Sequence, residues 1–203
     1  MPGWQQIVKR GLDITLSALG LVLLAVPFTF IALAIKRDSR GPVFFRHPRV
    51  GRHGRRFVPL KFRTMVEGAI DQGLGTTVTE DDARLTRVGS LLRRWALDEL
   101  PQLWNVLRGQ MSLVGPRPTF AYQVERYDEI QRRRLEVRPG ITGWAQINGR
   151  NVLSWPERIE LDVWYVDHAT LSLDVKILLR TLWLAFVVRG GIYGPAGVNQ
   201  DFR

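Results

Sequence analysis

The chain has 203 residues, of which 45% are hydrophobic and 24% charged; this is ordinary globular usage and excludes a disordered or low-complexity chain. It contains no cysteine, so a disulfide scaffold, a thiol nucleophile and a cysteine-ligated metal are excluded. Lysine and arginine number 29 against 19 aspartate and glutamate residues, and the net charge of +10 indicates a polyanionic partner. Nucleic acid, an anionic membrane surface and a phosphorylated substrate all fit this charge.

Residues 14–35 form an uncharged run of about 22 residues, long enough to cross a bilayer as a helix. Three interpretations are open: a cleaved signal peptide, a helix that crosses the membrane, and a re-entrant helix that enters and leaves on the same side. The run is too long for a usual signal peptide. Basic residues flank both of its ends, so the positive-inside rule favours two cytoplasmic ends. Pro27 lies inside the run and predicts a break or kink, which suits re-entry but also occurs in crossing helices.

The next segment, residues 36–63, contains ten basic residues and a single acid, Asp38. We expect this segment to lie on anionic headgroups, and the alternatives are a solvated basic face or a nucleic-acid surface. Short β-like runs within it, at residues 43–45 and 57–60, predict a small sheet.

Helical periodicity dominates the rest of the chain. The predicted helices cover residues 90–97, 103–107, 120–135, 155–165 and 173–188. The last of them is amphipathic and too charged to span a membrane, so we expect it to lie at an interface. The whole pattern predicts a helix-rich α/β fold with an N-terminal re-entrant membrane helix, amphipathic interfacial helices and a small β-sheet.

Asp98 and Glu99 form the pair of residues best suited to chemistry. Pro101 disfavours helical geometry at Leu100 and suits the start of a helix, so the two carboxylates are expected at a break between helices, where both can reach one cleft. Arginines at positions 84, 87, 93 and 94 lie nearby in the sequence. Carboxylates among arginines either form plain ion pairs or hold a divalent metal beside bound phosphates.

Two short motifs would add cations to such a site. Pro116 and Pro118 fix the backbone around Arg117, which suits a guanidinium held ready for phosphate; the alternative is a rigid turn with a surface arginine. Lys61 and Arg63 follow a β-like run and would place two more cations at the site. The alternative for that segment is one ordinary alternating strand.

Several longer strings occur in a fixed order along the chain: KRGLDI, GPVFFRHPRVG, LKFRTM, TRVGSLLRRWALDELPQLWNVLRGQMSLVGPRP, RPGITGWAQINGRN and ELDVWYVDHATLSLDVKILLRT. Together they resemble the small monotopic phosphoglycosyl transferases, a family of bacterial sugar transferases, over residues 7–193. The resemblance implies a re-entrant helix at the cytoplasmic face of the inner membrane. It also implies transfer of a sugar 1-phosphate, usually from a UDP-sugar, to polyprenyl (undecaprenyl) phosphate, with release of UMP and a requirement for Mg²⁺.

The resemblance further implies roles for individual residues. The Asp-Glu dyad of the family matches Asp98 and Glu99, with Asp98 as the nucleophile and a metal ligand. Positions that bind phosphate and substrate match Lys61, Arg93, Pro116, Arg117, Pro118 and Asp174. Many members place a serine before the kinking proline, where this chain has Val26. A serine hydroxyl there could bond a backbone carbonyl freed by the kink, and valine cannot.

The residue-level chemistry agrees with this reaction. Mg²⁺, lysine and arginine neutralise a diphosphate as its leaving group departs, and a carboxylate nucleophile divides the transfer into two steps through an acyl phosphate. We therefore expect a membrane-anchoring helix at residues 1–38 and a cytoplasmic-face catalytic domain at residues 39–203. The expected partners are a UDP-sugar, polyprenyl phosphate and anionic inner-membrane lipid, without nucleic acid, in the first membrane step of polysaccharide or glycoconjugate synthesis.

Three other functions remain as alternatives. A membrane-tethered nucleic-acid-binding protein is supported by charge alone, and its binding would depend strongly on salt. A structural membrane-anchored module would release no nucleotide from a UDP-sugar. An enzyme that transfers the sugar alone would release UDP instead of UMP. No residue in the sequence identifies the sugar.

Overall fold

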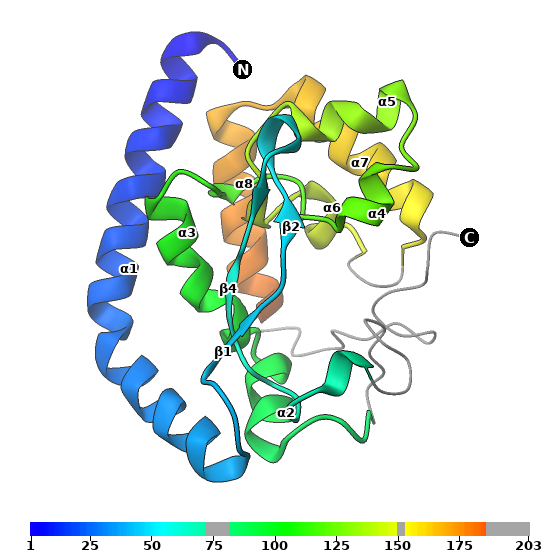
Figure 1. The fold of residues 1–203 in the computed structure, drawn as a ribbon. Helices are drawn as coiled ribbons and strands as arrows, with labels where there is room; N and C mark the ends of the chain where they lie inside the picture. The colour runs from blue at the N-terminus through cyan, green and yellow to red at the C-terminus, as the bar shows by residue number, and fades with distance from the viewer. Residues whose placement is uncertain (72–81, 150–152, 186–203) are drawn as a thin grey trace.

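The computed structural model describes residues 1–71, 82–149 and 153–185. Helices dominate this part of the chain, and its strands form three separate two-stranded sheets (Figure 1). The predicted fold class, helix-rich α/β with a long apolar N-terminal helix and little sheet, is confirmed. The predicted division at residue 38 stays a prediction.

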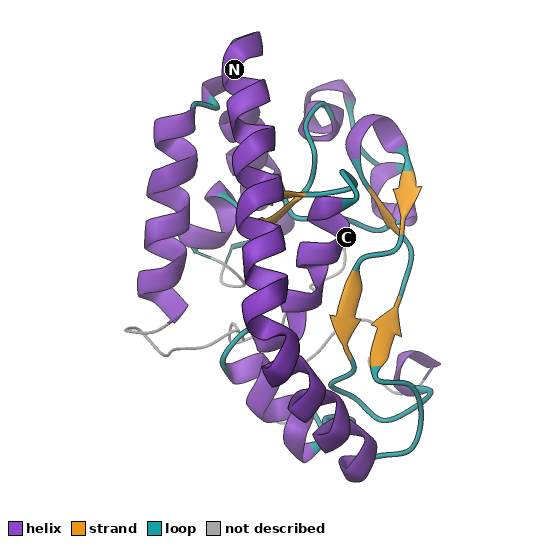
Figure 2. Cartoon of the chain, turned by 90° about the vertical axis from the view of Figure 1, so that its left-hand side faces the viewer, coloured by secondary structure: helices purple, strands orange, loops and turns teal. Residues whose placement is uncertain are grey.

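The N-terminal helix α1 (Gly3–Asp38) extends along one side of the molecule (Figures 1 and 2). Among the described residues it is the one helix long and apolar enough to cross a membrane; its most apolar 18-residue window has a mean hydropathy of 2.6, and 6% of that window is buried. Length and composition alone therefore leave both a crossing and a re-entrant helix open.

Pro27 lies inside α1 and does not interrupt it. The expected break is instead a bend in one continuous helix, and the helix does not fold back on itself (Figure 1). The hydroxyl of Thr29 donates to the carbonyl of Ala25 at 3.0 Å, a side-chain bond that favours bending. A hydroxyl is thus present in this turn although Val26 lacks one.

Charged residues attach the first half of α1 to the rest of the molecule. Arg10 donates to the last carbonyls of α3 (Leu103–Leu107), at 2.7 and 2.9 Å. Asp13 is 3% exposed and accepts hydrogen bonds from the backbone N–H of Leu113 at 2.9 Å and the hydroxyl of Ser112 at 3.1 Å. Because buried charged groups are costly unless they are paired, these contacts fix which face of the helix meets the protein.

The opposite face of α1 is apolar and uncovered. Large hydrophobic side chains are exposed there over several helical turns: Ile7, Leu12, Leu16, Leu19, Val22, Leu23, Val26 and Phe30. Uncovered apolar surface of this extent marks an interaction site with a membrane or another apolar partner.

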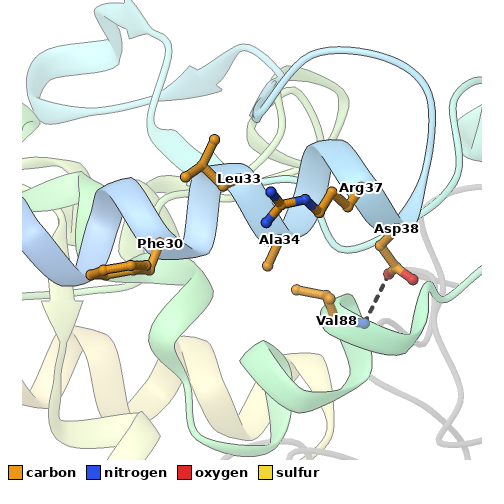
Figure 3. Close-up of a pocket in the computed structure, with 6 residues that line it drawn as sticks. All are labelled: Phe30, Leu33, Ala34, Arg37, Asp38 and Val88. Carbon is orange, nitrogen blue, oxygen red and sulfur yellow. Dashed lines mark hydrogen bonds between the residues drawn. The ribbon is translucent and has the colours of Figure 1, made fainter.

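The C-terminal part of α1 packs on α2 (Arg87–Arg94) and on the core beside it. The carboxylate of Asp38 accepts a hydrogen bond from the backbone N–H of Val88 at 2.8 Å, which satisfies one of the free donors at the start of α2 (Figure 3). Figure 3 also shows the groove that these helices border, lined in addition by Phe30, Leu33, Ala34 and Arg37. The adjoining core contains Ile35, Phe62 and Leu92.

The six strands of the described chain form three pairs. β1 (Phe44–Arg46) is antiparallel to β4 (Leu60–Phe62), β2 (Arg49–Val50) is antiparallel to β3 (Arg56–Phe57), and β5 (Ser112–Val114) is parallel to β6 (Gly140–Thr142). In register, Phe44 faces Phe62, Arg49 faces Phe57 and Ser112 faces Gly140. The run predicted at residues 57–60 is thus divided between β3 and β4.

Short helices connect these strands. They are η1 (Arg52–Gly54), η2 (Ala69–Asp71), η3 (Leu97–Gln102), α4 (Ala121–Val124), α5 (Glu129–Arg132), η4 (Arg133–Leu135) and α6 (Trp144–Ile147). The single helix predicted at residues 120–135 is therefore wrong. Asp128 is extended (φ −71°, ψ 179°), and its carboxylate accepts a hydrogen bond from the N–H of Gln131 at 2.8 Å, so the chain starts a new helix there.

The other predicted helices are confirmed. The helix predicted at residues 103–107 is α3, with the same bounds, and the remaining three correspond with shifted ends to α2, α7 (Trp155–His168) and α8 (Leu171–Trp183). Residues 186–188 of the last prediction lie outside the described residues. Val114 of β5 packs with Tyr165 of α7 and Ile177 of α8 in a buried cluster. This cluster supports the pair β5–β6, whose ends lead into the candidate site. The exposed side chains of α8 are mixed, since Val175, Leu179, Leu182 and Trp183 lie among Lys176 and Arg180. The place of this helix at an interface stays a prediction.

Candidate active site

Asp98 and Glu99 lie in η3, between α2 and α3, as the sequence predicts. The chain leaves α2 through Ala96, whose backbone is left-handed at φ 53°. That conformation is costly for a residue with a Cβ atom and persists only where the surroundings enforce it. It turns the dyad out of the line of α2 and toward β4, where Asp98 is 3% exposed.

Lys61 reaches both carboxylates from β4. Its Nζ lies 2.7 Å from Oδ2 of Asp98 and 3.2 Å from Oε1 of Glu99. The second oxygen of Asp98, Oδ1, accepts no hydrogen bond from the described part of the chain and is not sealed from solvent. One oxygen of Asp98 is therefore held by a cation, and the other keeps its lone pairs available.

Arg117 bonds the second carboxylate of the dyad. Its Nη2 lies 2.6 Å from Oε1 of Glu99 and its Nη1 lies 3.0 Å from Oε2, so the guanidinium and the carboxylate form a two-bond fork. This planar geometry is available to arginine and not to lysine. Glu99 is thus bonded by two cations that come from different parts of the chain.

The charges in this cluster determine which groups are ionised. Burial favours the neutral form of Glu99, but the positive charges of Arg117 and Lys61 outweigh it and hold the pKa of Glu99 well below its ordinary value. The charge of Glu99 in turn raises the pKa of Arg117, although burial opposes this. Glu99 is therefore a carboxylate across the neutral pH range.

The loop that carries Arg117 begins where β5 ends. The N–H of Gly115 donates to the carbonyl of Thr142 at 2.9 Å, and the carbonyl of Pro116 accepts from the N–H of Gly140 at 2.9 Å. A Cβ atom on Gly115 would lie 2.3 Å from the carbonyl oxygen of Arg138, so no larger residue fits this approach. The backbone on both sides of the loop start is thereby fixed before Pro118 restricts it further.

A buried ion pair supports the same loop from behind. The side chains of Arg134, in η4, and Asp162, in α7, are each 2% exposed, and Nη2 lies 2.5 Å from Oδ2. The same Nη2 donates to the carbonyl of Arg117 at 3.0 Å. The guanidinium of Arg134 also donates to the hydroxyl of Tyr127. Arg134 is therefore a positioning residue for Arg117.

Three residues that the sequence assigned to substrate binding lie apart from this cluster. Arg63 is 5% exposed and donates to the carbonyls of Ser39, at 2.8 Å, and Arg40, so it holds the end of α1. The carboxylate of Asp174 lies 2.5 Å from Nζ of Lys9, and it accepts a hydrogen bond from Tyr165 at 2.6 Å. Arg93 donates through Nε to the hydroxyl of Thr64 at 2.8 Å. None of the three bonds the dyad within the described residues.

Sequence reasoning missed two features of the site. Arg134 and Asp162 are 28 positions apart, and no local pattern indicates that they pair. Arg49 lies close enough to the charges of Arg117 and Glu99 to interact with both. The position of Arg49 in the string GPVFFRHPRVG is the available signal. The other basic residues of the segment 36–63 do not distinguish Arg49 from a general basic surface.

The carboxylates suit a hard divalent cation. The described residues contain no group of three or more aspartate, glutamate, histidine or cysteine side chains that would form a complete metal cage. Mg²⁺ commonly takes one or two carboxylates and completes its shell with substrate phosphates and water. Asp98, with its free Oδ1, and Glu99 beside it fit that mode of binding.

Residues 4–190 match the family model described as "Bacterial sugar transferase". The chain belongs to the bacterial sugar transferase family. This confirms the resemblance in the sequence, and the transferase is similar over most of its length to several curated members.

The uncharacterized sugar transferase EpsL of Bacillus subtilis is 46% identical over 184 residues, which cover 91% of this chain and 90% of that protein. The undecaprenyl-phosphate glucose phosphotransferase of Komagataeibacter xylinus is 44% identical over 191 residues, covering 88% of this chain and 36% of that protein. The UDP-glucose:undecaprenyl-phosphate glucose-1-phosphate transferase of Escherichia coli is 41% identical over 195 residues, covering 92% of this chain and 42% of that protein. The sugar transferase thus spans less than half the length of the Komagataeibacter xylinus and Escherichia coli relatives, whose names state a reaction.

The ion pair behind Arg117 provides the first test of this site. Asp162→Asn leaves the charge of Arg134 buried without a counterion, so we expect the free energy of unfolding to fall by about 3–5 kcal/mol. The measurement is chemical unfolding of detergent-held protein. Asp167→Asn is the matched control, because it removes the same charge from α7 at a pair whose side chains are 41% and 39% exposed. That variant should lose less than about 1 kcal/mol. Equal losses in the two variants would contradict the supporting role of the buried pair.

Proposed function

We propose that this sugar transferase moves a sugar 1-phosphate from a UDP-sugar to polyprenyl phosphate and releases UMP. One observation carries the proposal: the Asp98–Glu99 dyad lies between Lys61 and Arg117, so a carboxylate with a free oxygen stands among cations that suit a diphosphate. The Escherichia coli relative is named a UDP-glucose:undecaprenyl-phosphate glucose-1-phosphate transferase, and the Komagataeibacter xylinus relative an undecaprenyl-phosphate glucose phosphotransferase. Both names support the same class of reaction. The sugar itself is not part of the proposal.

In the first step, Oδ1 of Asp98 attacks the phosphorus that carries the sugar. A new bond forms between this oxygen and phosphorus, the bond from phosphorus to the oxygen of UMP breaks, and UMP leaves with the electron pair. Lys61 and Arg117 offset the negative charge of the diphosphate while the leaving group departs. Asp98 then carries the sugar phosphate as an acyl phosphate.

In the second step, a phosphate oxygen of the lipid attacks the same phosphorus. The bond between phosphorus and Asp98 breaks, the carboxylate is restored, and the polyprenyl-diphosphate sugar forms. Asp98 would hold Mg²⁺, which when bound supplies further neutralisation of phosphate charge. Lys61 remains beside Oδ2 of Asp98 throughout and keeps the carboxylate in its orientation.

We assign Glu99 an orienting role. Three roles suit its place in the dyad: accepting the last proton of the lipid phosphate, orienting its neighbours, or contacting the metal. A carboxylate whose pKa is held far below its ordinary value is a weak base toward a phosphate with a second pKa near 6. Its bonds to Lys61 and Arg117 instead support a role in which Glu99 holds these two cations in place next to Asp98.

We further propose that the protein is monotopic on the cytoplasmic face of the bacterial inner membrane. Arg10 and Asp13 bond the globular part from the same helix that exposes an apolar face on its other side. The other end of α1 bonds the same body through Asp38 and the N–H of Val88, so a helix that crossed a bilayer would have to break the contacts at one of its ends and leave charged groups unpaired. A helix that bends at Pro27 and stays attached keeps the dyad near the headgroups, where polyprenyl phosphate and anionic lipid lie. The excess of positive charge serves these phosphates, and nucleic acid is not a proposed partner.

Substitution of the dyad tests the reaction. Asp98→Asn removes the nucleophile with little change of shape and should abolish UMP release from every sugar in a panel of UDP-sugars, assayed in nanodiscs with Mg²⁺ and polyprenyl phosphate. Glu99→Gln should retain turnover reduced by about 10- to 1,000-fold, because it loosens two cations without removing the nucleophile. EDTA should suppress the parent activity. Turnover of Asp98→Asn equal to that of the parent would exclude Asp98 as the nucleophile.

The same variants test the role of Glu99 through pH. Turnover should fall as pH drops through about 6, because the lipid phosphate gains its second proton there. The pKa of Glu99 is lowered, so Glu99 stays ionised in this pH range and does not contribute to the fall in turnover. The fall should therefore occur at the same pH in Glu99→Gln and in the parent. If turnover of Glu99→Gln no longer fell near pH 6, the proton would be assigned to Glu99 instead.

Labelling tests the topology, and the absence of cysteine makes single-cysteine variants clean probes. Gly3→Cys has free space around the new side chain, and Lys36→Cys lies at the other end of α1 on an exposed position. A membrane-impermeant maleimide should label both from the cytoplasmic side alone. Val22→Cys, whose parent side chain is 74% exposed on the apolar face, should react only after detergent is added. Labelling of the first two variants from opposite sides would mean that α1 crosses the membrane.

A further inference from the structure

Arg49 is fixed beside the loop that carries Arg117. It lies in β2, where it faces Phe57 in the antiparallel pair, and the N–H of the next residue, Val50, donates to the carbonyl of Thr119 at 2.8 Å. The following residue of the loop, Phe120, places its ring under the guanidinium, with 3.3 Å between Cζ of Arg49 and the ring centroid. The backbone bridge and the stacked ring together hold this side chain in one place.

Arg49 has no ion-pair partner among the described residues. Lys61, Arg117 and Arg134 each lie against at least one carboxylate. The guanidinium of Arg49 instead has one polar side-chain contact, between Nη1 and Nδ1 of His47 at 3.3 Å. Phe120 covers one face of the guanidinium. The other N–H groups of Arg49 donate no hydrogen bond within the described part of the chain.

The surroundings make this unpaired charge costly. Burial and the positive charge of Arg117 together lower the pKa of Arg49 to about 9, and Tyr122 and Glu99 only partly oppose them. The side chain is still charged at neutral pH. A partly buried cation without a counterion gains free energy when an anion binds, and the planar guanidinium suits phosphate oxygens.

We propose that Arg49 binds a phosphate group of the substrates and forms with Arg117 a two-arginine phosphate site next to the dyad. This proposal rests on the transfer reaction proposed above. The two arginines differ in one respect: Glu99 already neutralises Arg117, whereas Arg49 keeps its full charge. A phosphate can therefore bind Arg49 without breaking the pair between Arg117 and Glu99, which keeps Lys61 and Asp98 in place. The donor diphosphate and the lipid phosphate share the required chemistry, and experiment can separate them.

The test compares Arg49→Gln with Arg49→Lys and with Arg56→Gln. Arg56 lies on the neighbouring strand β3 and is exposed, so its substitution removes the same charge from the same hairpin without touching the stacked ring. Full-length proteins in nanodiscs are titrated with UDP and, separately, with a short-chain polyprenyl phosphate. Both dissociation constants and both KM values are measured.

Arg49→Gln should weaken binding by about 10- to 100-fold, the effect of losing a hydrogen bond to a charged group. Arg49→Lys should lose less, because the charge remains while the fork is lost, and Arg56→Gln should change by less than about threefold. Weaker binding of UDP with a higher donor KM identifies the donor diphosphate as the ligand. Weaker binding of the lipid alone identifies the acceptor phosphate.

Unchanged dissociation constants for both ligands in Arg49→Gln and Arg49→Lys would overturn the proposal, as would an equal loss in Arg56→Gln. Arg49→Lys keeps the charge and can keep a cation–π contact with Phe120, so it provides a folded variant if the glutamine variant does not fold. Binding is read without turnover. A parent enzyme that binds UDP but releases no UMP therefore contradicts the transfer reaction alone, and a parent that binds neither ligand contradicts both.

Discussion

Glu99 is half-buried beside two cations, and the balance of these charges holds three distant parts of the chain together. Lys61 comes from β4, the dyad from η3 and Arg117 from the loop after β5. Removal of Lys61 would leave the buried carboxylate of Asp98 without its counterion, which costs far more than an exposed ion pair contributes. Removal of Glu99 would leave Arg117 without its carboxylate partner. The same balance leaves one oxygen of Asp98 free, so the contacts that stabilise the site also prepare its nucleophile.

The surrounding fold serves to place these charges. The parallel pair β5–β6 and the close approach at Gly115 fix the start of the loop that bears Arg117, and Arg134 holds the carbonyl of Arg117 from the other side. Helix α1 bonds the same body through buried polar groups and turns its apolar face outward. A membrane bound to that face would therefore lie at a fixed distance from the dyad, as a lipid substrate requires.

Much of this could be predicted from the sequence where the signal is local. Asp98 and Glu99 precede Pro101, and the resulting break between helices needs only neighbouring residues. Long-range pairing could not be predicted in this way. Arg63 and Asp174 are charged residues in strings that match the family. Arg63, however, donates to the backbone carbonyls of residues 39 and 40, and Asp174 pairs with the ammonium of Lys9. The prediction of one helix at residues 120–135 was wrong because the side chain of Asp128 caps a new helix and competes with helical periodicity.

In the proposed transfer, Asp98 carries the sugar phosphate between the two steps. This is measured directly by mass spectrometry of the protein after incubation with UDP-sugar and Mg²⁺ in the absence of polyprenyl phosphate. We expect UMP release of at most one equivalent and a sugar-phosphate adduct on the peptide that contains Asp98, removed when the lipid is added. Transfer to the lipid without any such adduct, under conditions that preserve acyl phosphates, would contradict it and indicate direct attack of the lipid on the donor.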